Sequence, residues 1–249
     1  MARKKRLNIH NTDKVFNLTI VQQYEQGNEV VVTLENIQEI NESIQGRLDK
    51  QGKLKSRDNT HYIVRYAENF TMGALSLLIQ YGGSYTLETK KGISEEYLPL
   101  LAENRKNGRV SFVLRDKYSF EQVQAIVRFS EVLTVSMVIL LKAGEPKSGT
   151  IIRALSQLRY RIDKVELSFP TITKEEYRAL SDRESLYELD NGLYVPTVDY
   201  KYHMFSELRN ACSFWKMNLI MRAHSETEYK KLVELADVDK AVRKGNLTW

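Results

Sequence analysis

Hydrophobic and polar positions along the chain follow two periods, one typical of strands and one typical of helices. Seven short runs rich in β-branched and aromatic residues predict strands at 17–24, 29–34, 84–89, 110–115, 135–141, 164–169 and 218–221. Between these runs or after them, apolar residues recur at helical spacing over 95–104, 120–133, 150–161, 202–215 and 228–236. The chain therefore predicts strands that alternate with helices over most of its length.

Hydroxyl side chains mark where several of these helices begin. Ser94, Ser119 and Ser225 each come just before acidic or amide residues, which is the pattern of an N-cap or a capping box. The predicted strands from 84 to 164 begin 25 to 29 residues apart, with one helix in each interval. Such a repeat of apolar strands predicts a parallel sheet covered by helices. Seven or more units favour an α/β fold of the TIM-like (β/α) barrel type over an open doubly wound sheet.

Length and composition favour a single soluble domain. The chain has 249 residues, 42% of them apolar, and its single cysteine excludes a disulfide framework and a cysteine zinc site. No apolar run approaches the 18 residues or so of a membrane span, and polar residues follow the basic N-terminus where a signal peptide would be apolar. Glycines do not follow any strand in a phosphate-binding pattern. We therefore expect a cytoplasmic protein without a membrane contact or a bound cofactor, in which a tail (1–14) precedes one domain (15–249).

The net charge of +5 lies mostly in the tail, since residues 1–14 hold five basic residues and one acidic residue. A second basic stretch at 50–57 is diluted by acidic neighbours and has the composition of a solvated loop. A basic tail is usually a solvated terminus, but it also allows binding of nucleic acid through residues 1–14.

The four histidines and the single cysteine are the remaining candidates for metal ligands. His10, His61, His203 and His224 show no metal-ligand spacing, so each is expected to be a surface or loop residue. Cys212 falls on an apolar helical pattern and is expected to be a core thiol. These residues predict no metal site.

Aromatic residues cluster in one part of the chain. Tyr194, Tyr200 and Tyr202 are interleaved with Lys201 and His203. Such rings can stack on bases, or they can pack against one another or against a protein partner. The sequence leaves both interpretations open.

Several segments resemble the EAL family of cyclic di-GMP phosphodiesterase domains. N-L-I-M-R-A-H-S-E-T at 218–227 is similar to that family's strand and E-G-V-E-T turn, and R-I-D-K-V-E-L-S-F at 161–169 is similar to its K-x-D-x-S-F strand. Y-I-V-R-Y-A-E-N at 62–69 resembles F-I-P-L-A-E, which begins a helix in the family. The first two predicted strands resemble its opening hairpin. The resemblance spans 15–249, with an insertion at about 185–200.

The EAL reaction needs carboxylates and an asparagine that hold two divalent cations. The aligned positions hold Val32, Glu88, Val113, Leu141, Lys142, Ala223 and Arg243 or Lys244. Only Lys164 and Glu166 keep the family's chemical character. The resemblance therefore implies a degenerate domain without a metal or phosphodiesterase activity. Such a domain acts in bacterial signalling as a regulatory module that binds a protein partner, or as a receptor for cyclic di-GMP.

The resemblance also suggests which residues would contact a ligand. In a receptor, the cationic side chains near the strand ends would face a phosphate, namely Lys142, Lys164, Arg222 and Arg243. The competing interpretation of each is a side chain that packs its stem on the rim and keeps its charge in water.

A different hypothesis is an active barrel enzyme with its own site at the strand ends. Its candidate residues are Arg115, Asp116, Glu166, His224 and Glu226. The third hypothesis is a nucleic-acid-binding protein that uses the tail. Of these three functions, the catalytically inactive EAL-like binding module is the leading prediction, because the resemblance spans the domain and the metal ligands are missing, and the other two are its alternatives.

Overall fold

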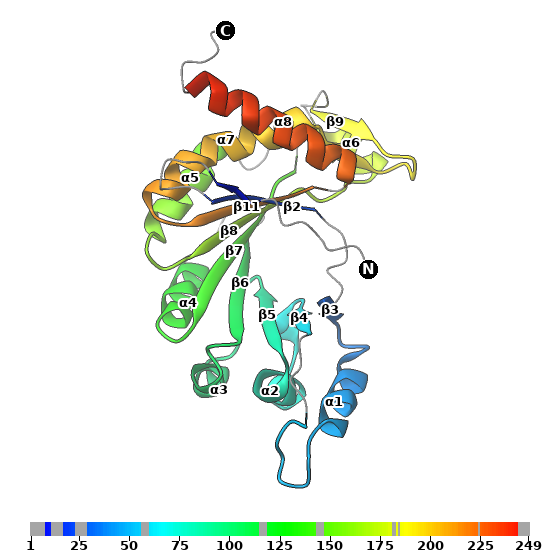
Figure 1. The fold of residues 1–249 in the computed structure, drawn as a ribbon, viewed down its shortest axis with the longest axis vertical. Helices are drawn as coiled ribbons and strands as arrows, with labels where there is room; N and C mark the ends of the chain where they lie inside the picture. Colours follow the sequence, from blue (N-terminus) through cyan, green and yellow to red (C-terminus); the bar gives the residue numbers. More distant parts are fainter. Residues whose placement is uncertain are drawn as a thin grey trace.

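The computed structural model describes residues 8–10, 17–22, 29–55, 60–114, 119–142, 147–180, 183, 185–223 and 225–243. A curved nine-stranded sheet forms its centre, with the strand order β1-β2-β11-β8-β7-β6-β5-β4-β3 (Figure 1). Neighbouring strands run parallel, except that β1 is antiparallel to β2. The strands of this sheet are β1 (Asn8–His10), β2 (Asn17–Gln22), β3 (Glu29–Val32), β4 (His61–Val64), β5 (Ser84–Thr89), β6 (Gly108–Leu114), β7 (Thr134–Leu140), β8 (Lys164–Ser168) and β11 (Asn218–Ala223).

Helices cover one side of this sheet. They are α1 (Ile37–Gly46), α2 (Met72–Tyr81), α3 (Leu98–Glu103), α4 (Phe120–Ser130), α5 (Ser148–Gln157), α7 (Val198–Phe214) and α8 (Glu226–Arg243), with the 3-10 helices η1 (Ala67–Asn69) and η2 (Glu95–Tyr97) between them. The strands alternate, so that one set of side chains meets the helices: Val165 and Leu167 of β8 are fully buried on that side. The main core therefore lies between the sheet and the helices.

The other side of the sheet, which is concave, carries many polar residues. The ring of His61 contacts the hydroxyls of Ser84 and Thr86, at 2.7 Å and 3.1 Å, and Ser136 donates to Ser111 at 3.1 Å. Parallel sheets are normally covered by apolar layers on both faces. Here hydrogen bonds between side chains on neighbouring strands satisfy polar groups on the concave side.

The predicted α/β class with a mainly parallel sheet is confirmed, because parallel strands and helices alternate and successive strands from β3 to β8 are neighbours in the sheet. The predicted caps are also confirmed: Ser94 accepts from Glu96, Ser119 forms a capping box with Gln122, and Ser225 accepts from Glu228. The described residues show no pairing between β2 and β3, so within them the sheet is open.

Two expectations drawn from the resemblance are wrong. The segments of β2 and β3 do not form a hairpin, since β3 ends the strand order on one side and β2, near the other end, pairs with β1 and β11 instead. The segment 62–69 does not begin as a helix, since its first residues belong to β4 and only η1 follows. Tyr62 and Val64 are buried while their neighbours are half-exposed, and this alternation is that of a strand. His61 is consequently a sheet residue and not a loop residue.

The segment expected to be an insertion forms a small unit of its own. Strands β9 (Leu186–Glu188) and β10 (Tyr194–Pro196) make an antiparallel pair separate from the main sheet. Helix α6 (Lys174–Ala179) precedes them, and Ile172, Leu186 and Tyr194 form a small cluster of buried residues there. Among the described helices, none has the length and apolar composition needed to cross a bilayer.

Candidate functional site

A cavity of about 780 Å³ lies at the carboxyl edge of the sheet, and we call it the carboxyl-edge pocket. Its walls come from the start of α7, from α8 between Thr227 and Val238, and from β9. The polar residues that line it are Tyr187, Thr197, Asp199, Ser225, Thr227, Glu228, Lys231 and Glu234, and the apolar ones are Val198, Leu235 and Val238. This volume is typical of small-molecule sites, and (β/α) folds carry their chemistry at this edge.

Local sequence explains why both helices begin at the pocket. Thr197 caps α7 by accepting a hydrogen bond from the backbone of Tyr200, at 3.3 Å. Ser225, which comes soon after β11, accepts from the backbone of Glu228 at 3.1 Å. Each hydroxyl satisfies a backbone group that the helix leaves without an internal partner. The two caps therefore fix where the side chains of both first turns lie.

A buried ion pair stands behind the pocket wall. The ammonium nitrogen of Lys201, on α7, lies 2.6 Å from a carboxylate oxygen of Glu228, on α8. The two side chains are 0% and 3% exposed, so water screens this pair very little. Lys201 also lies 5.6 Å from the centre of the Phe169 ring. Glu228 therefore lines the pocket with only a small exposed part of its side chain, while its carboxylate is paired with a completely buried cation.

Burial changes the acid–base properties around this pair. The loss of water lowers the pKa of Lys201, and the charge of Glu228 opposes that change. Burial and the charge of Glu228 together raise the pKa of Tyr187. Perturbed groups beside a cavity are a recognised mark of functional sites, although structural ion pairs produce them too.

The remaining charges give the pocket an acidic character. Asp199, Glu228 and Glu234 line it, against the single lysine Lys231. The buried Lys201 balances Glu228, which leaves a net negative charge. Carboxylates in the first turn of a helix also interact favourably with the helix dipole, and this accounts in part for Asp199 and Glu228.

The two lysines predicted for phosphate binding do not lie together. Lys142 follows β7 and lies 2.9 Å from Glu176, whereas Lys164 begins β8 and lies 3.1 Å from Glu166. Lys164 is in register with Ser136, so Lys142 is six residues, or roughly 20 Å, further along the strand direction. Both lysines are already in ion pairs.

The other predicted site residues are only partly covered by the structure. Arg222 lies in β11 and Arg243 ends α8, and their side chains lie outside the description. Glu226 begins α8, and its side chain also lies outside the description. Arg115, Asp116, His224 and Lys244 lie outside the described residues, as do residues 1–7 and 11–14 of the predicted tail. Residues 8–10 of that tail form β1 of the main sheet, so His10 is a sheet residue and not a loop residue. Glu166 is 8% exposed within β8 and is paired with Lys164, away from the carboxyl-edge pocket.

Several positions aligned with EAL cation ligands belong to the core. Val32, Leu141 and Ala223 are fully buried in the main hydrophobic cluster. Glu88 and Val113 are half-exposed strand residues. Within the described ranges, no group of three or more His, Cys, Asp or Glu side chains is placed to hold a metal ion.

The tyrosines are used for packing. Tyr194 is 7% exposed and stacks on Tyr177 with ring centres 4.0 Å apart, and Tyr202 donates to Asp239 at 2.9 Å. Base stacking by Tyr194 is therefore wrong, and self-packing is confirmed. Cys212 is buried as expected, and His203 is a surface residue beside Glu207.

Sequence reasoning missed the pair of Lys201 and Glu228, although one signal was present. Lys201 falls on the same helical stripe as Met204, Phe205 and Leu208, which are all buried. A lysine at such a position needs a buried partner. Its partner lies 27 residues later, and no local spacing identifies it.

Comparisons with known proteins bear on the fold alone. No family model matches the chain, and no curated protein matches it. Among solved structures, the chain is similar to a spore photoproduct lyase variant, with 12% identity, a TM-score of 0.51, and coverage of 76% of this chain and 67% of that one. It is also similar to Streptococcus suis SuiB bound to the precursor peptide SuiA, with 13% identity, a TM-score of 0.46, and coverage of 69% of this chain and 40% of that one. The first likeness agrees with an α/β fold built on a mostly parallel sheet.

Proposed function

We propose that the protein binds a small organic molecule in the carboxyl-edge pocket, and that this molecule carries an amine on an apolar body. The observation that carries the proposal is the position of Glu228 on the pocket wall, paired behind with the fully buried Lys201. Lys201 restricts the orientation of the carboxylate, so that Glu228 is held in place before a ligand arrives. Such preorganisation reduces the entropy lost on binding.

The lining supports this choice of ligand. Asp199 and Glu234 add negative charge at the mouth, which favours a cation and disfavours an anion. Val198, Leu235 and Val238 offer apolar surface for the rest of the molecule. An ammonium group on a hydrocarbon or aromatic body matches both features.

A matched ligand series tests the proposal. Saturation-transfer NMR would compare phenethylamine, the neutral 2-phenylethanol and the anionic 3-phenylpropionate at equal concentration. We expect binding in the order amine, alcohol, carboxylate, because only the amine is attracted to the carboxylates. Equal binding of all three, or the reverse order, would contradict the proposal.

Two variants then locate the site. Glu228→Gln is expected to weaken amine binding about tenfold or more, since a charge-assisted hydrogen bond is lost. Val238→Trp fills the pocket from a half-exposed position and is expected to block binding without touching the buried pair. Glu176→Gln removes a carboxylate from a surface ion pair elsewhere and is the control. Binding that survives Val238→Trp would place the ligand outside this pocket.

The EAL resemblance implies a different ligand, and it stays a prediction. Cyclic di-GMP carries two phosphates, which the pocket carboxylates would repel. The resemblance assigns cyclic di-GMP to Lys142, Lys164, Arg222 and Arg243, none of which is among the described residues that line this pocket, so the amine and cyclic di-GMP are separate predictions that direct titration of each tests.

A further inference from the structure

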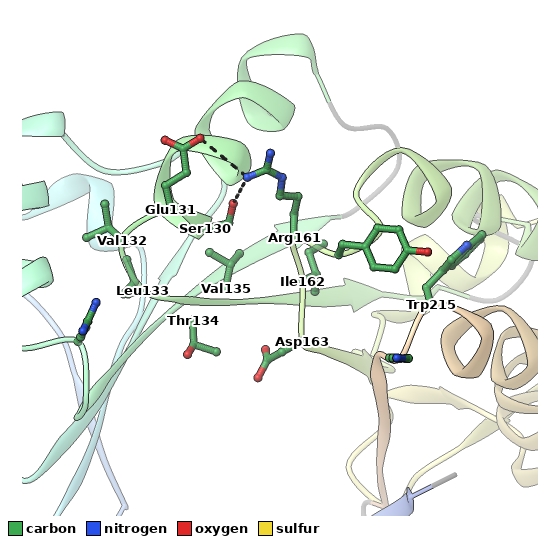
Figure 2. Close-up of a pocket in the computed structure, with 13 residues that line it drawn as sticks. Ser130, Glu131, Val132, Leu133, Thr134, Val135, Arg161, Ile162, Asp163 and Trp215 are labelled. Atoms are coloured by element: carbon green, nitrogen blue, oxygen red, sulfur yellow. Dashed lines mark hydrogen bonds and ion pairs between the residues drawn. The ribbon is translucent and has the colours of Figure 1, made fainter. Parts of the chain in front are cut away.

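A second cavity, of about 520 Å³, lies at the opposite edge of the sheet, where turns lead into β7, β8 and β11 (Figure 2). We call this region the amino-edge rim. Thr134 begins β7, Asp163 precedes β8 and Lys216 precedes β11, and all three line the cavity. The rim is separate from the carboxyl-edge pocket and shares no lining residue with it.

Aromatic rings are unusually exposed on the rim. Tyr160 is 74% exposed, and Phe214 is 78% exposed. Trp215 lines the cavity and lies 6.5 Å from Phe214, ring centre to ring centre. Tyr160 and Phe214 at this level of exposure contribute little to the core, so packing does not explain their presence. Trp215 is partly buried and packs against the core with part of its surface.

Cationic side chains surround these rings. Arg105, Arg161 and Lys216 line the cavity. Within the described part of the chain, neither Arg105 nor Lys216 has an ion-pair partner. Arg161 is 3.8 Å from Glu131 and 3.5 Å from the Ser130 hydroxyl, which are long contacts (Figure 2).

The rim's other acidic group is already neutralised. Asp163 accepts two hydrogen bonds from Arg109, at 3.2 Å and 3.1 Å. The accessible charge of the rim is therefore positive, and it favours an anionic ligand.

Two non-glycine residues of the rim have a strained, left-handed backbone conformation. Tyr160 and Lys216 have φ angles of 65° and 58°, just after α5 and α7. Glycine adopts this left-handed conformation without strain and is the usual residue after a helix. A tyrosine and a lysine in these places are not explained by the needs of the turns.

We propose that the amino-edge rim binds single-stranded nucleic acid. Bases stack on Tyr160 and Trp215, while phosphates contact Arg105, Arg161 and Lys216. Rings interleaved with cations are the general chemistry by which proteins hold single strands without reading their sequence. This surface is distinct from the basic tail and independent of the function proposed for the carboxyl-edge pocket.

Fluorescence anisotropy of a labelled twelve-nucleotide oligothymidine, titrated with the full-length protein at several salt concentrations, tests the proposal. Three phosphate contacts predict a logarithmic salt slope of about −2. Tyr160→Gly should weaken binding about fivefold or more with the slope unchanged, because it removes stacking. Lys216→Gly should weaken binding and reduce the slope by about 0.7.

These glycine variants also separate binding from folding. Glycine relieves backbone strain at both positions, so neither variant should unfold at a lower temperature than the parent. Tyr66→Gly is the matched control, since Tyr66 is an exposed tyrosine with a φ of 54° that lies elsewhere, after β4. A Trp249→Phe background leaves Trp215 as the single tryptophan, and its fluorescence should be quenched by the oligonucleotide.

Clear outcomes would overturn the proposal. One is unchanged affinity in both rim variants together with complete loss on deletion of residues 1–14, which would assign binding to the tail. Another is affinity for thymidine monophosphate equal to that for the oligonucleotide, which would indicate a mononucleotide site. No detectable binding at low salt would also reject it.

Discussion

Lys201 and Glu228 join α7 to α8 through a contact of 2.6 Å that is closed off from water. Removal of one partner leaves a buried charge without compensation, whereas replacement of both by apolar residues removes the problem. We expect Lys201→Met to lower the free energy of unfolding by about 3–5 kcal/mol, and Lys201→Met with Glu228→Leu to recover most of that loss. Urea denaturation measures both, and a double variant no more stable than the single one would contradict this account.

Gly108 is the position where a single methyl group should be most damaging. A Cβ atom there would lie 2.1 Å from the ring of Tyr85, which is 1% exposed and is the register partner of Gly108. We expect Gly108→Ala to cost about 1–3 kcal/mol, because the buried ring has to move. Gly149, inside α5, has open space around it. Gly149→Ala should therefore stabilise the protein by about 0.5–1 kcal/mol. Thermal unfolding tests whether the first variant unfolds at a lower temperature than the parent and the second at a higher one.

The thiol of Cys212 predicts a loss of stability in alkaline solution. Burial raises its pKa from an ordinary value of about 9 to about 12. The folded chain thus holds a proton that the unfolded chain releases between these values, so stability falls as the pH rises above 9. At pH 10 this group should lower the free energy of unfolding by about 1.4 kcal/mol relative to pH 7.

Cys212→Val is the variant that tests this pH dependence. Without the thiol, the free energy of unfolding should fall less between pH 7 and pH 10 than it does in the parent. Urea denaturation at each pH measures this difference. The tyrosines contribute equally in both proteins. Identical pH profiles of variant and parent would show that the thiol does not titrate as described.

Cyclic di-GMP provides the direct test of the EAL resemblance. The aligned cation-ligand positions Val32, Leu141 and Ala223 are buried in the core, so we expect no hydrolysis of cyclic di-GMP with Mg²⁺ or Mn²⁺. Calorimetric titration with and without these ions, followed by an assay for the linear product, measures binding and cleavage in the same samples. Metal-dependent cleavage would show that a different set of ligands is present.

Sequence patterns predicted the centre of the fold well, because each signal there is local. Of the runs that became β5 to β8, the one at β7 is almost continuously apolar, those at β5 and β8 alternate apolar and polar residues, and helices lie between them at regular intervals. Helices α1 and α2 were not predicted, although Ile37, Ile40 and Ile44 have helical spacing. Strand β4 resembles a motif that begins a helix, and its four residues are too few for their period-two alternation to outweigh that likeness.

The candidate site was less accessible to sequence reasoning for a physical reason. A carboxylate and an ammonium that pair across two helices leave no spacing signal, since the helices meet only in the folded chain. The lysine on an apolar stripe showed that a partner was needed but not which one. Rim residues such as Tyr160 and Lys216 become informative only with their φ angles and exposure.

The place of β2 between β1 and β11 has a consequence for synthesis on the ribosome. Its parallel partner, β11, begins almost 200 residues later in the chain. At typical translation rates, β2 waits roughly 10–40 s for that partner, while β3 to β8 can already assemble from the residues that follow. The first strands to be made are therefore among the last to be placed, and the N-terminal segment joins a sheet that the rest of the chain has built.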